Sequence, residues 1–264
     1  MISSILALLR SEYHKKICIN LLGHRPGKKD VYSNADDSSI VSIELARGLA
    51  DRLGGPFCTN PPSAQGACEL FIQLTKEFLS TTLGLLQHLR PGEWRFLASK
   101  GSGDYLITPD IVVSRDPLSD GEINAGSKGK DAIVSDRDKT SGFTPLRKQN
   151  FPADYQLLHA SISCKWTMRS DRAQNTRTEA LNLIRNRKGR VPNIVAVTFE
   201  PLPARLASLA LGTGDIDCTY HGALHELIDA AKNSSYQDAF ELLTLMVDGR
   251  RLRDISDLPF DLAI

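Results

Sequence analysis

The stretch that decides the fold is residues 161–190, SISCKWTMRSDRAQNTRTEALNLIRNRKGR. Polar and apolar side chains alternate over its first six residues, which is typical of a β-strand with two differently covered faces. Ser163 and Lys165 therefore share one face of the predicted strand. Ile162 and Cys164 share the other, so a lysine ends a strand that is otherwise suited to a protein interior.

A helix and a second strand follow directly. Ser170 or Asp171 can cap a helix N-terminus, residues 173–188 contain neither proline nor glycine, and Gly189 is a typical helix stop. Residues 193–199 (NIVAVTF) have the continuous apolar character of a buried strand. The stretch therefore predicts a β-α-β unit with a parallel crossover, at the centre of an α/β fold.

Positive charge is concentrated in this unit. Residues 165–190 contain eight basic and two acidic side chains, a net charge of +6, whereas the whole chain carries only +1. Arg169 and Arg172 stand at the predicted helix start, although a helix N-terminus favours anions. A solvated helix face is one interpretation of this charge. Contact with DNA is the other, and it gives the two arginines a purpose.

Composition and cysteine content set the broad class. A chain of 264 residues with 41% apolar and 24% charged residues can form one large globular domain over residues 1–264. The N-terminal residues 1–16 have a short apolar run interrupted by charges, which predicts a helix rather than a signal peptide, and no stretch approaches transmembrane length. The odd number of cysteines and the absence of C-x-x-C spacing favour a reducing cytoplasm over a disulfide or zinc framework: they are Cys18, Cys58, Cys68, Cys164 and Cys218.

Further elements follow from periodicity and turn residues. Helices are predicted over residues 2–22, 42–53, 66–89, 223–232 and 236–247, and strands over 94–97 and 105–114. Pro109 falls inside the strand predicted for 105–114, which indicates an edge strand or a bulge. Residues 115–155 are rich in Asp, Gly, Ser and Lys and predict little regular structure, so they form a loop or an interaction arm.

Three residues together indicate metal-dependent phosphodiester hydrolysis. Asp110 lies among apolar strand residues, where a carboxylate is costly without a partner or a metal, although a turn aspartate is the simpler alternative. Carboxylates that hold one or two Mg²⁺ ions, with a lysine beside them, can activate water and stabilise charge on a phosphate. Pro109-Asp110 and Lys165 fit the PD…(D/E)xK nuclease pattern. Ser163 occupies the position of the second acid, and Glu179 on the next helix can replace it.

Further segments of the sequence match a known group of proteins: residues 31–36 (VYSNAD), 106–113 (LITPDIVV), 158–167 (LHASISCKWT), 169–175 (RSDRAQN), 211–218 (LGTGDIDC) and 253–259 (RDISDLP). Through them the chain resembles the CCGG-core group of type II restriction endonucleases. This resemblance covers most of the chain and is densest after residue 157. It also accounts for Ser163, because in this group the second acid stands on the helix, where Glu179 lies.

The resemblance implies a fold, an activity and a set of roles. It implies a PD-(D/E)xK fold with a central mixed sheet flanked by helices. The implied activity is Mg²⁺-dependent cleavage of double-stranded DNA at GCCGGC, cut after the first G to leave 5′-phosphate overhangs. The implied assembly is a homotetramer of two back-to-back dimers. The implied catalytic residues are Asp110, Lys165, Glu179, Ser163 and the more remote Glu69, with Asp110, Glu179 and the backbone carbonyl of Cys164 as Mg²⁺ ligands. The implied readers of the CCGG core are Arg169, Asp171 and Arg172, and those of the outer base pair are Asp36 and Arg205.

Other interpretations are compatible with parts of the sequence. A repair or junction-resolving nuclease of the same fold would share the metal site but would not need the Arg-x-x-Arg reader around Asp171. A DNA-binding protein with a decayed active site conflicts with the presence of Asp110, Lys165 and Glu179. A nucleotide-binding loop at residues 212–214 would have to open a helix, and the following residues DIDC do not predict one. Glu69, taken alone, is also compatible with a surface acid near a helix start.

Overall fold

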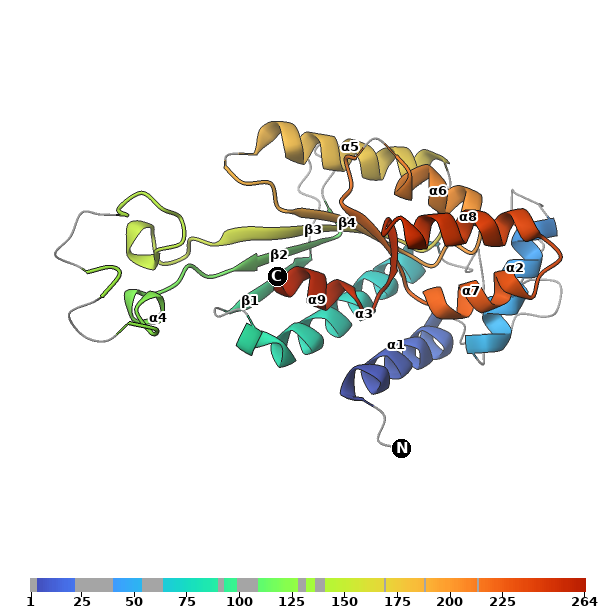
Figure 1. Cartoon of the computed structure of the whole chain (residues 1–264), viewed down its shortest axis with the longest axis horizontal. Helices are drawn as coiled ribbons and strands as arrows, with labels where there is room; N and C mark the ends of the chain where they lie inside the picture. Colours follow the sequence, from blue (N-terminus) through green and yellow to red (C-terminus); the bar gives the residue numbers. More distant parts are fainter. Residues whose placement is uncertain are drawn as a thin grey trace.

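The computed structural model describes residues 4–21, 40–53, 64–89, 93–98, 109–127, 132–135, 141–168, 170–187, 189–212 and 214–264. A six-stranded mixed sheet lies at its centre (Figure 1). The strands lie side by side in chain order: β1 (Trp94–Ala98), β2 (Ile111–Arg115), β3 (Leu157–Lys165), β4 (Asn193–Thr198), β5 (Cys218–His221) and β6 (Leu252–Asp254). β1, β2 and β3 pair antiparallel, and β3 to β6 pair parallel. The parallel crossover predicted from the central stretch is confirmed.

Helices lie on both faces of this sheet. The α-helices are α1 (Ile5–Leu21), α2 (Ile40–Leu53), α3 (Ala64–Leu85), α4 (Asp120–Ile123), α5 (Ser170–Asn186), α6 (Pro203–Ala210), α7 (Leu224–Lys232), α8 (Gln237–Asp248) and α9 (Leu258–Ala263), and short 3₁₀ helices span Gln87–Leu89 and Lys148–Asn150. In Figure 1, α5 and α6 lie on one side of the central strands, while α1, α3 and α9 lie on the other. The predicted α/β class, with a central mixed sheet flanked by helices, is confirmed.

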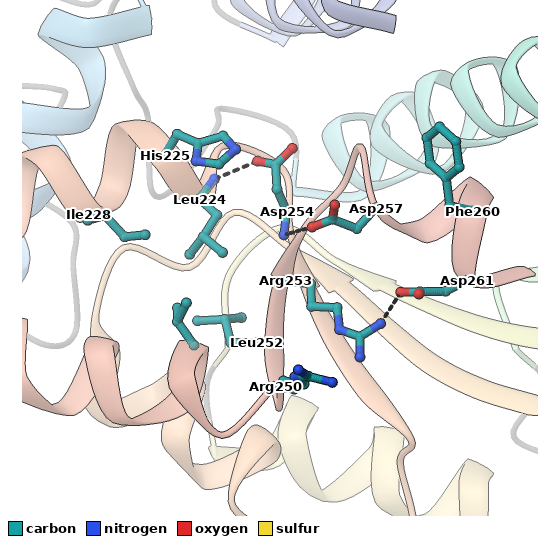
Figure 2. A pocket seen from close by; sticks show the side chains of 11 residues that line it. Leu224, His225, Ile228, Arg250, Leu252, Arg253, Asp254, Asp257, Phe260 and Asp261 are labelled. Carbon is teal, nitrogen blue, oxygen red and sulfur yellow. Dashed lines mark hydrogen bonds and ion pairs between the residues drawn. The ribbon is translucent and has the colours of Figure 1, made fainter.

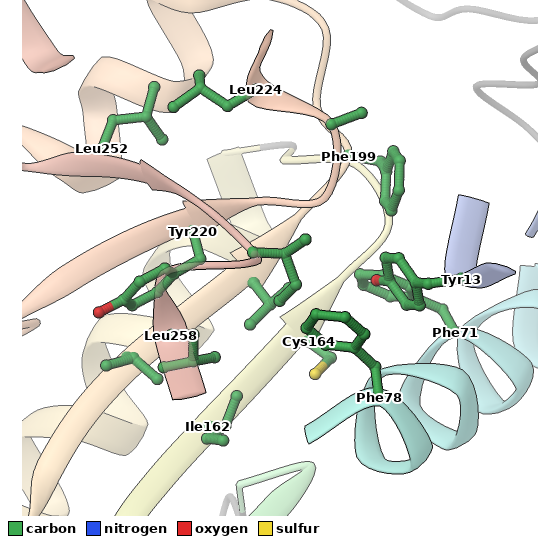
Figure 3. Close-up of a cluster of buried hydrophobic side chains, with 14 of the residues drawn as sticks. Tyr13, Phe71, Phe78, Ile162, Cys164, Phe199, Tyr220, Leu224, Leu252 and Leu258 are labelled. Carbon is green, nitrogen blue, oxygen red and sulfur yellow. The ribbon is translucent and has the colours of Figure 1, made fainter. Parts of the chain in front are cut away.

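Two apolar clusters hold the helices to the sheet. The larger cluster joins Phe71 and Phe78 of α3 to Ile162 and Cys164 of β3, and Figure 3 shows these side chains directed toward one another. The smaller cluster includes Ala180 of α5 and residues of β4 and α6. Successive side chains of β3 therefore point to opposite faces of the sheet, and helices cover both faces of this strand.

The strand that carries Pro109 differs from expectation. β2 begins at Ile111, so Pro109 and Asp110 precede the strand, and residues 105–108 lie outside the described part. β2 pairs with β1 on one side and β3 on the other, which makes the predicted edge strand wrong. The physical reason is that a proline before the first paired residue removes no hydrogen bond from the ladder. A bulge is present, but it lies between Val113 and Ser114.

The described parts of the 115–155 segment contain more structure than composition suggests. The segment projects from one end of the sheet in Figure 1. Leu118 and Arg147 form a β-bridge, and Ser119 caps α4 through a reciprocal pair of hydrogen bonds with Glu122. Arg147 is 1% exposed and donates to Asp120 over 2.6 Å (Nε to Oδ1). This buried ion pair holds the two ends of the segment together. The charge-rich composition alone did not indicate such ordered structure.

The C-terminal edge of the sheet is tied to the N-terminal helix. Arg10 of α1 donates to both Glu226 of α7 (2.6 Å) and Asp254 of β6 (2.9 Å). Figure 2 shows Asp254 also accepting from the Leu224 backbone, beside an ion pair between Arg253 and Asp261 that lines a cavity of about 470 Å³. None of the predicted site residues that the structure describes lines this cavity. Within the described residues, no helix is both long and apolar enough to span a bilayer.

Candidate active site

The antiparallel pairing of β2 and β3 brings two distant predicted residues together. Ile111 at the start of β2 stands opposite Ile162 of β3, so Asp110 lies beside the carboxyl end of β3. The Asp110 carboxylate accepts hydrogen bonds from the Cys164 backbone N–H and from the Lys165 ammonium, both at 2.7 Å. The carboxylate that sequence reasoning considered costly therefore has two donors, one of them charged.

Lys165 is held as a cation in this arrangement. Burial lowers the pKa of its ammonium, but the adjacent Asp110 carboxylate and the more distant Glu179 outweigh burial and leave the pKa above its usual value. The side chain is 16% exposed, so its charge is largely shielded from bulk solvent. A fixed ammonium of this kind can donate to a phosphate oxygen and orient a water molecule.

Glu179 reaches the same region from α5. The helix packs on β3 through a hydrogen bond between the hydroxyls of Ser163 and Thr176 (3.2 Å), three residues before Glu179. Burial raises the pKa of the Glu179 carboxyl to about 7, Lys165 and a hydrogen bond from Ser163 oppose the rise, and Asp110 adds to it. Its Oε2 atom is buried and has no hydrogen-bond partner among the residues that the structure describes. A buried carboxylate oxygen without a partner is a natural ligand for a cation.

The remaining predicted catalytic residue, Glu69, lies on α3 near this centre. α3 begins at Ala64, so Glu69 is beyond the first turn, and the explanation by the helix dipole is weakened. Burial raises the pKa of the neighbouring Cys68 thiol, and the charges of Asp110, Lys165 and Glu69 also influence this pKa. Glu69 therefore lies within electrostatic reach of the same thiol as Asp110 and Lys165. The Cys68 thiol lies 3.9 Å from the Cys164 carbonyl oxygen. Sequence reasoning missed Cys68, and its position next to Glu69 was the available signal.

The oxygen atoms of this centre fit a magnesium ion better than a softer metal. The described residues contain no group of three or more His, Cys, Asp or Glu side chains placed to hold a metal. Mg²⁺ commonly uses only one or two carboxylates, completing its shell with water and substrate oxygens. Asp110, Glu179 and the Cys164 carbonyl can supply such a shell, and the unpartnered Oε2 of Glu179 is the structural observation in favour.

The predicted DNA-reading residues are placed in part. Asp171 is exposed in the first turn of α5, and Arg172 donates to the carbonyl (3.3 Å) and hydroxyl (3.2 Å) of Thr167. Arg205 on α6 has its guanidinium 3.5 Å from the Glu200 carboxylate. Asp36 and Arg169 lie outside the described residues.

The glycine-rich segment at 211–214 does not have the context of a phosphate-binding loop. Gly212 follows α6, and the next regular element is strand β5. Gly214 has a positive φ of 85°, which fits a turn. A phosphate-binding loop would lead from a strand into a helix N-terminus, so the nucleotide-binding interpretation gains no support.

Comparison with known proteins agrees with the geometry. The family model described as NgoMIV restriction enzyme matches residues 13–103 and 97–264. The type II restriction enzyme NgoMIV of Neisseria gonorrhoeae is 42% identical over 288 residues, covering 97% of each chain. A solved complex of restriction endonuclease PspGI with substrate DNA covers 97% of this chain and 91% of its own, at 14% identity and a TM-score of 0.31, a likeness too weak to support an argument.

Proposed function

Because the chain belongs to the NgoMIV restriction enzyme family, we propose that it cuts double-stranded DNA at GCCGGC with the help of Mg²⁺. Membership makes the protein a type II site-specific deoxyribonuclease, and the proposal adds the metal, the target and the cut after the first G. The observation that carries it is the Asp110–Lys165 ion pair at the end of β3, beside the unpartnered carboxylate oxygen of Glu179.

The proposed chemistry is hydrolysis that leaves a 5′-phosphate. Asp110, Glu179 and the Cys164 carbonyl would hold one or two Mg²⁺ ions, which supply charge neutralisation at the scissile phosphate and a more acidic water. Lys165 orients the attacking water and donates to a phosphate oxygen. The water oxygen bonds to phosphorus as the water gives up a proton to solvent. The bond to the 3′ oxygen breaks, and this leaving oxygen takes up a proton from solvent to become the 3′ hydroxyl.

Ser163 and Glu69 have supporting parts in this proposal. Ser163 keeps the Glu179 carboxylate oriented through its hydroxyl, on the strand position that other nucleases of this plan give to an acid. Glu69 adds negative charge at the rim of the centre, where it strengthens the attraction for a cation.

Base recognition is assigned to the start of α5 and to two residues outside it. Arg169 and Arg172 would donate bidentately to guanine O6 and N7, and Asp171 would accept from cytosine N4, so these three would read the CCGG core in the major groove. Asp36 and Arg205 would read the outer base pair. The exposure of Asp171 in the first turn of α5 supports its part in this assignment.

A palindromic site also implies more than one copy of the chain. Each copy carries one set of catalytic residues, so cutting both strands requires two copies related by the twofold axis of the site. We propose a homotetramer of two back-to-back dimers, built from chains that each form one domain over residues 1–264 and act in the cytoplasm.

Digestion of plasmids with one or two GCCGGC sites in Mg²⁺, followed by mapping of the cut ends, tests this proposal. Cuts after the first G of GCCGGC are expected, and faster cutting of the two-site plasmid is expected from a tetramer. Cuts at a different CCGG-containing sequence would overturn the assignment of Asp36 and Arg205. Scattered nicking would contradict site-specific cleavage and favour a repair nuclease of the same fold.

A further inference from the structure

Glu200 is a charged residue that the proposed mechanism does not use. It lies just beyond the end of β4 and is 0% exposed. Its carboxylate accepts from the backbone N–H of Met168 (2.7 Å) and of Leu202 (3.0 Å), and it lies 3.5 Å from the Arg205 guanidinium. Burying a carboxylate costs free energy unless hydrogen-bond donors or cations surround it. Glu200 has three such partners, and together they fix the position of its side chain.

The partners of Glu200 belong to two separate DNA-reading elements. Met168 lies two residues before the start of α5, which carries Asp171 and Arg172 of the proposed readers of the CCGG core. Arg205 on α6 is a proposed reader of the outer base pair. The same carboxylate oxygen, Oε2, accepts from Met168 and faces Arg205. One buried charge therefore fixes both elements relative to each other.

Neighbouring contacts strengthen this connection. The Trp166 carbonyl accepts from the Phe199 N–H (3.1 Å) and from the Thr198 hydroxyl (3.3 Å). On the other side of the segment, Arg172 donates to Thr167. The residues between β3 and α5 thus contact both the end of β4 and the start of α5, and Glu200 supplies the negative charge among these contacts.

We propose that Glu200 is a positioning residue that aligns Arg205 with the start of α5, so that the outer base pair and the CCGG core are read as one unit. The inference rests on the proposed role of Arg205. Glu200 itself touches no base, and it acts by fixing where the Arg205 guanidinium can point. Without the negative charge, Arg205 loses one of the contacts that restrict its rotamers, and contacts to the outer base pair lose their alignment.

The test is binding of four duplexes that share CCGG and differ in the outer base pair, measured with Ca²⁺ in place of Mg²⁺. Wild-type protein, Glu200→Gln, Arg205→Ala and the double variant are compared. Glu200→Gln keeps one acceptor for the Met168 N–H but places an uncharged amide near Arg205. We expect it to reduce the preference for GCCGGC over the other duplexes by about tenfold, the scale of one bidentate base contact. In the Arg205→Ala background it should cause no further loss of preference.

A matched control separates alignment from general stability. Glu226→Gln removes a carboxylate that pairs with Arg10 at 2.6 Å on α7, a helix that carries none of the proposed DNA-reading residues, and it should leave the preference unchanged. If Glu200→Gln does not fold, Glu200→Asp keeps the charge on a shorter side chain and should reduce the preference to a smaller extent. The melting temperature of each variant shows which proteins are folded before binding is measured.

The outcomes distinguish this inference from the proposed function. An equal loss of affinity for all four duplexes in Glu200→Gln, with the preference intact, would show a purely structural role and overturn the inference alone. Additive losses in the double variant would overturn it as well. A wild-type protein without preference among the four duplexes would instead overturn the assigned target, and the inference with it.

Discussion

Replacing Glu179 by glutamine should make the metal-free protein more stable at alkaline pH while abolishing cleavage. The ionised carboxylate is partly buried, its Oε2 has no hydrogen-bond partner in the described part of the chain, and the Asp110 carboxylate lies close enough to add to the rise in its pKa. Glutamine has nearly the same shape and no charge. The substitution therefore removes an unfavourable charge that the folded chain keeps for its chemistry.

The size of the effect follows from the pKa of Glu179. Burial raises it from 4.5 to about 7. At roughly 1.4 kcal/mol per pH unit, this difference would destabilise the ionised folded state by about 3 kcal/mol. The carboxyl is incompletely buried, so solvent screening reduces the expected gain to about 1–2 kcal/mol. The sign is that of a raised carboxyl pKa: wild-type stability falls as pH rises from about 4.5 to about 7, and the deficit persists above that range.

Urea denaturation in EDTA at pH 5 and pH 8.5 measures this prediction. Wild type and Glu179→Gln should have similar free energies of unfolding at pH 5, and the variant should be more stable at pH 8.5. Adding Mg²⁺ at pH 8.5 should stabilise only the wild type, because a ligand of the folded state stabilises it in proportion to its binding. Glu77→Gln is the control, because Glu77 forms an exposed ion pair with Lys16. This substitution should change the free energy of unfolding little, and by a similar amount at both pH values. A Glu179→Gln protein that is less stable than wild type at pH 8.5 would refute the reasoning.

Four other outcomes are expected. Lys165→Ala should abolish cleavage but retain specific DNA binding, because the ammonium contacts the reacting phosphate in the proposed site, and retained turnover in a digestion assay would contradict its catalytic role. Asp171→Ala should weaken binding by about 1–3 kcal/mol at one core base pair, and a uniform loss across all sequences in a competition assay would show that Asp171 only positions the protein. Ca²⁺ should support binding without cleavage, since its looser coordination does not align the attack, so full cleavage in Ca²⁺ would argue against the Mg²⁺ mechanism. Asp120→Ala should lower the free energy of unfolding by about 3–5 kcal/mol, because it removes a carboxylate that pairs with the buried Arg147 guanidinium, and an unchanged urea midpoint would show that the ion pair contributes little.

The central unit could be predicted because its information is local. Alternation in β3, polar residues at the start of α5 and a glycine after the helix are signals within a few residues of the elements they define. α5 begins at Ser170, so the two predicted caps, Ser170 and Asp171, lie in its first turn. Gly189 has a φ of 93° in the structure, a value that residues with a side chain rarely adopt. This backbone conformation explains why a glycine follows the end of α5.

The position of β2 could not be predicted in the same way. Whether Pro109 lies in a strand or before it depends on which residue first pairs with β3, and that register is fixed by a neighbour about 50 residues later. Glu200 has the same difficulty. In the sequence it precedes a proline and resembles a turn acid, yet its shortest hydrogen bond is to Met168, 32 residues earlier.

The placement of the second acid shows why a strand motif alone was insufficient. Ser163 occupies the strand position that the nuclease pattern gives to an acid, and this residue is 5% exposed beneath α5. A carboxylate attached there would be enclosed by the helix, with desolvation acting on both of its oxygens. Glu179 brings its carboxylate from the helix itself and remains partly accessible, while Ser163 keeps only a hydroxyl that can donate to it. The acid can thus stay ionisable near neutral pH because helix packing, rather than strand spacing, sets its distance from Asp110 and Lys165.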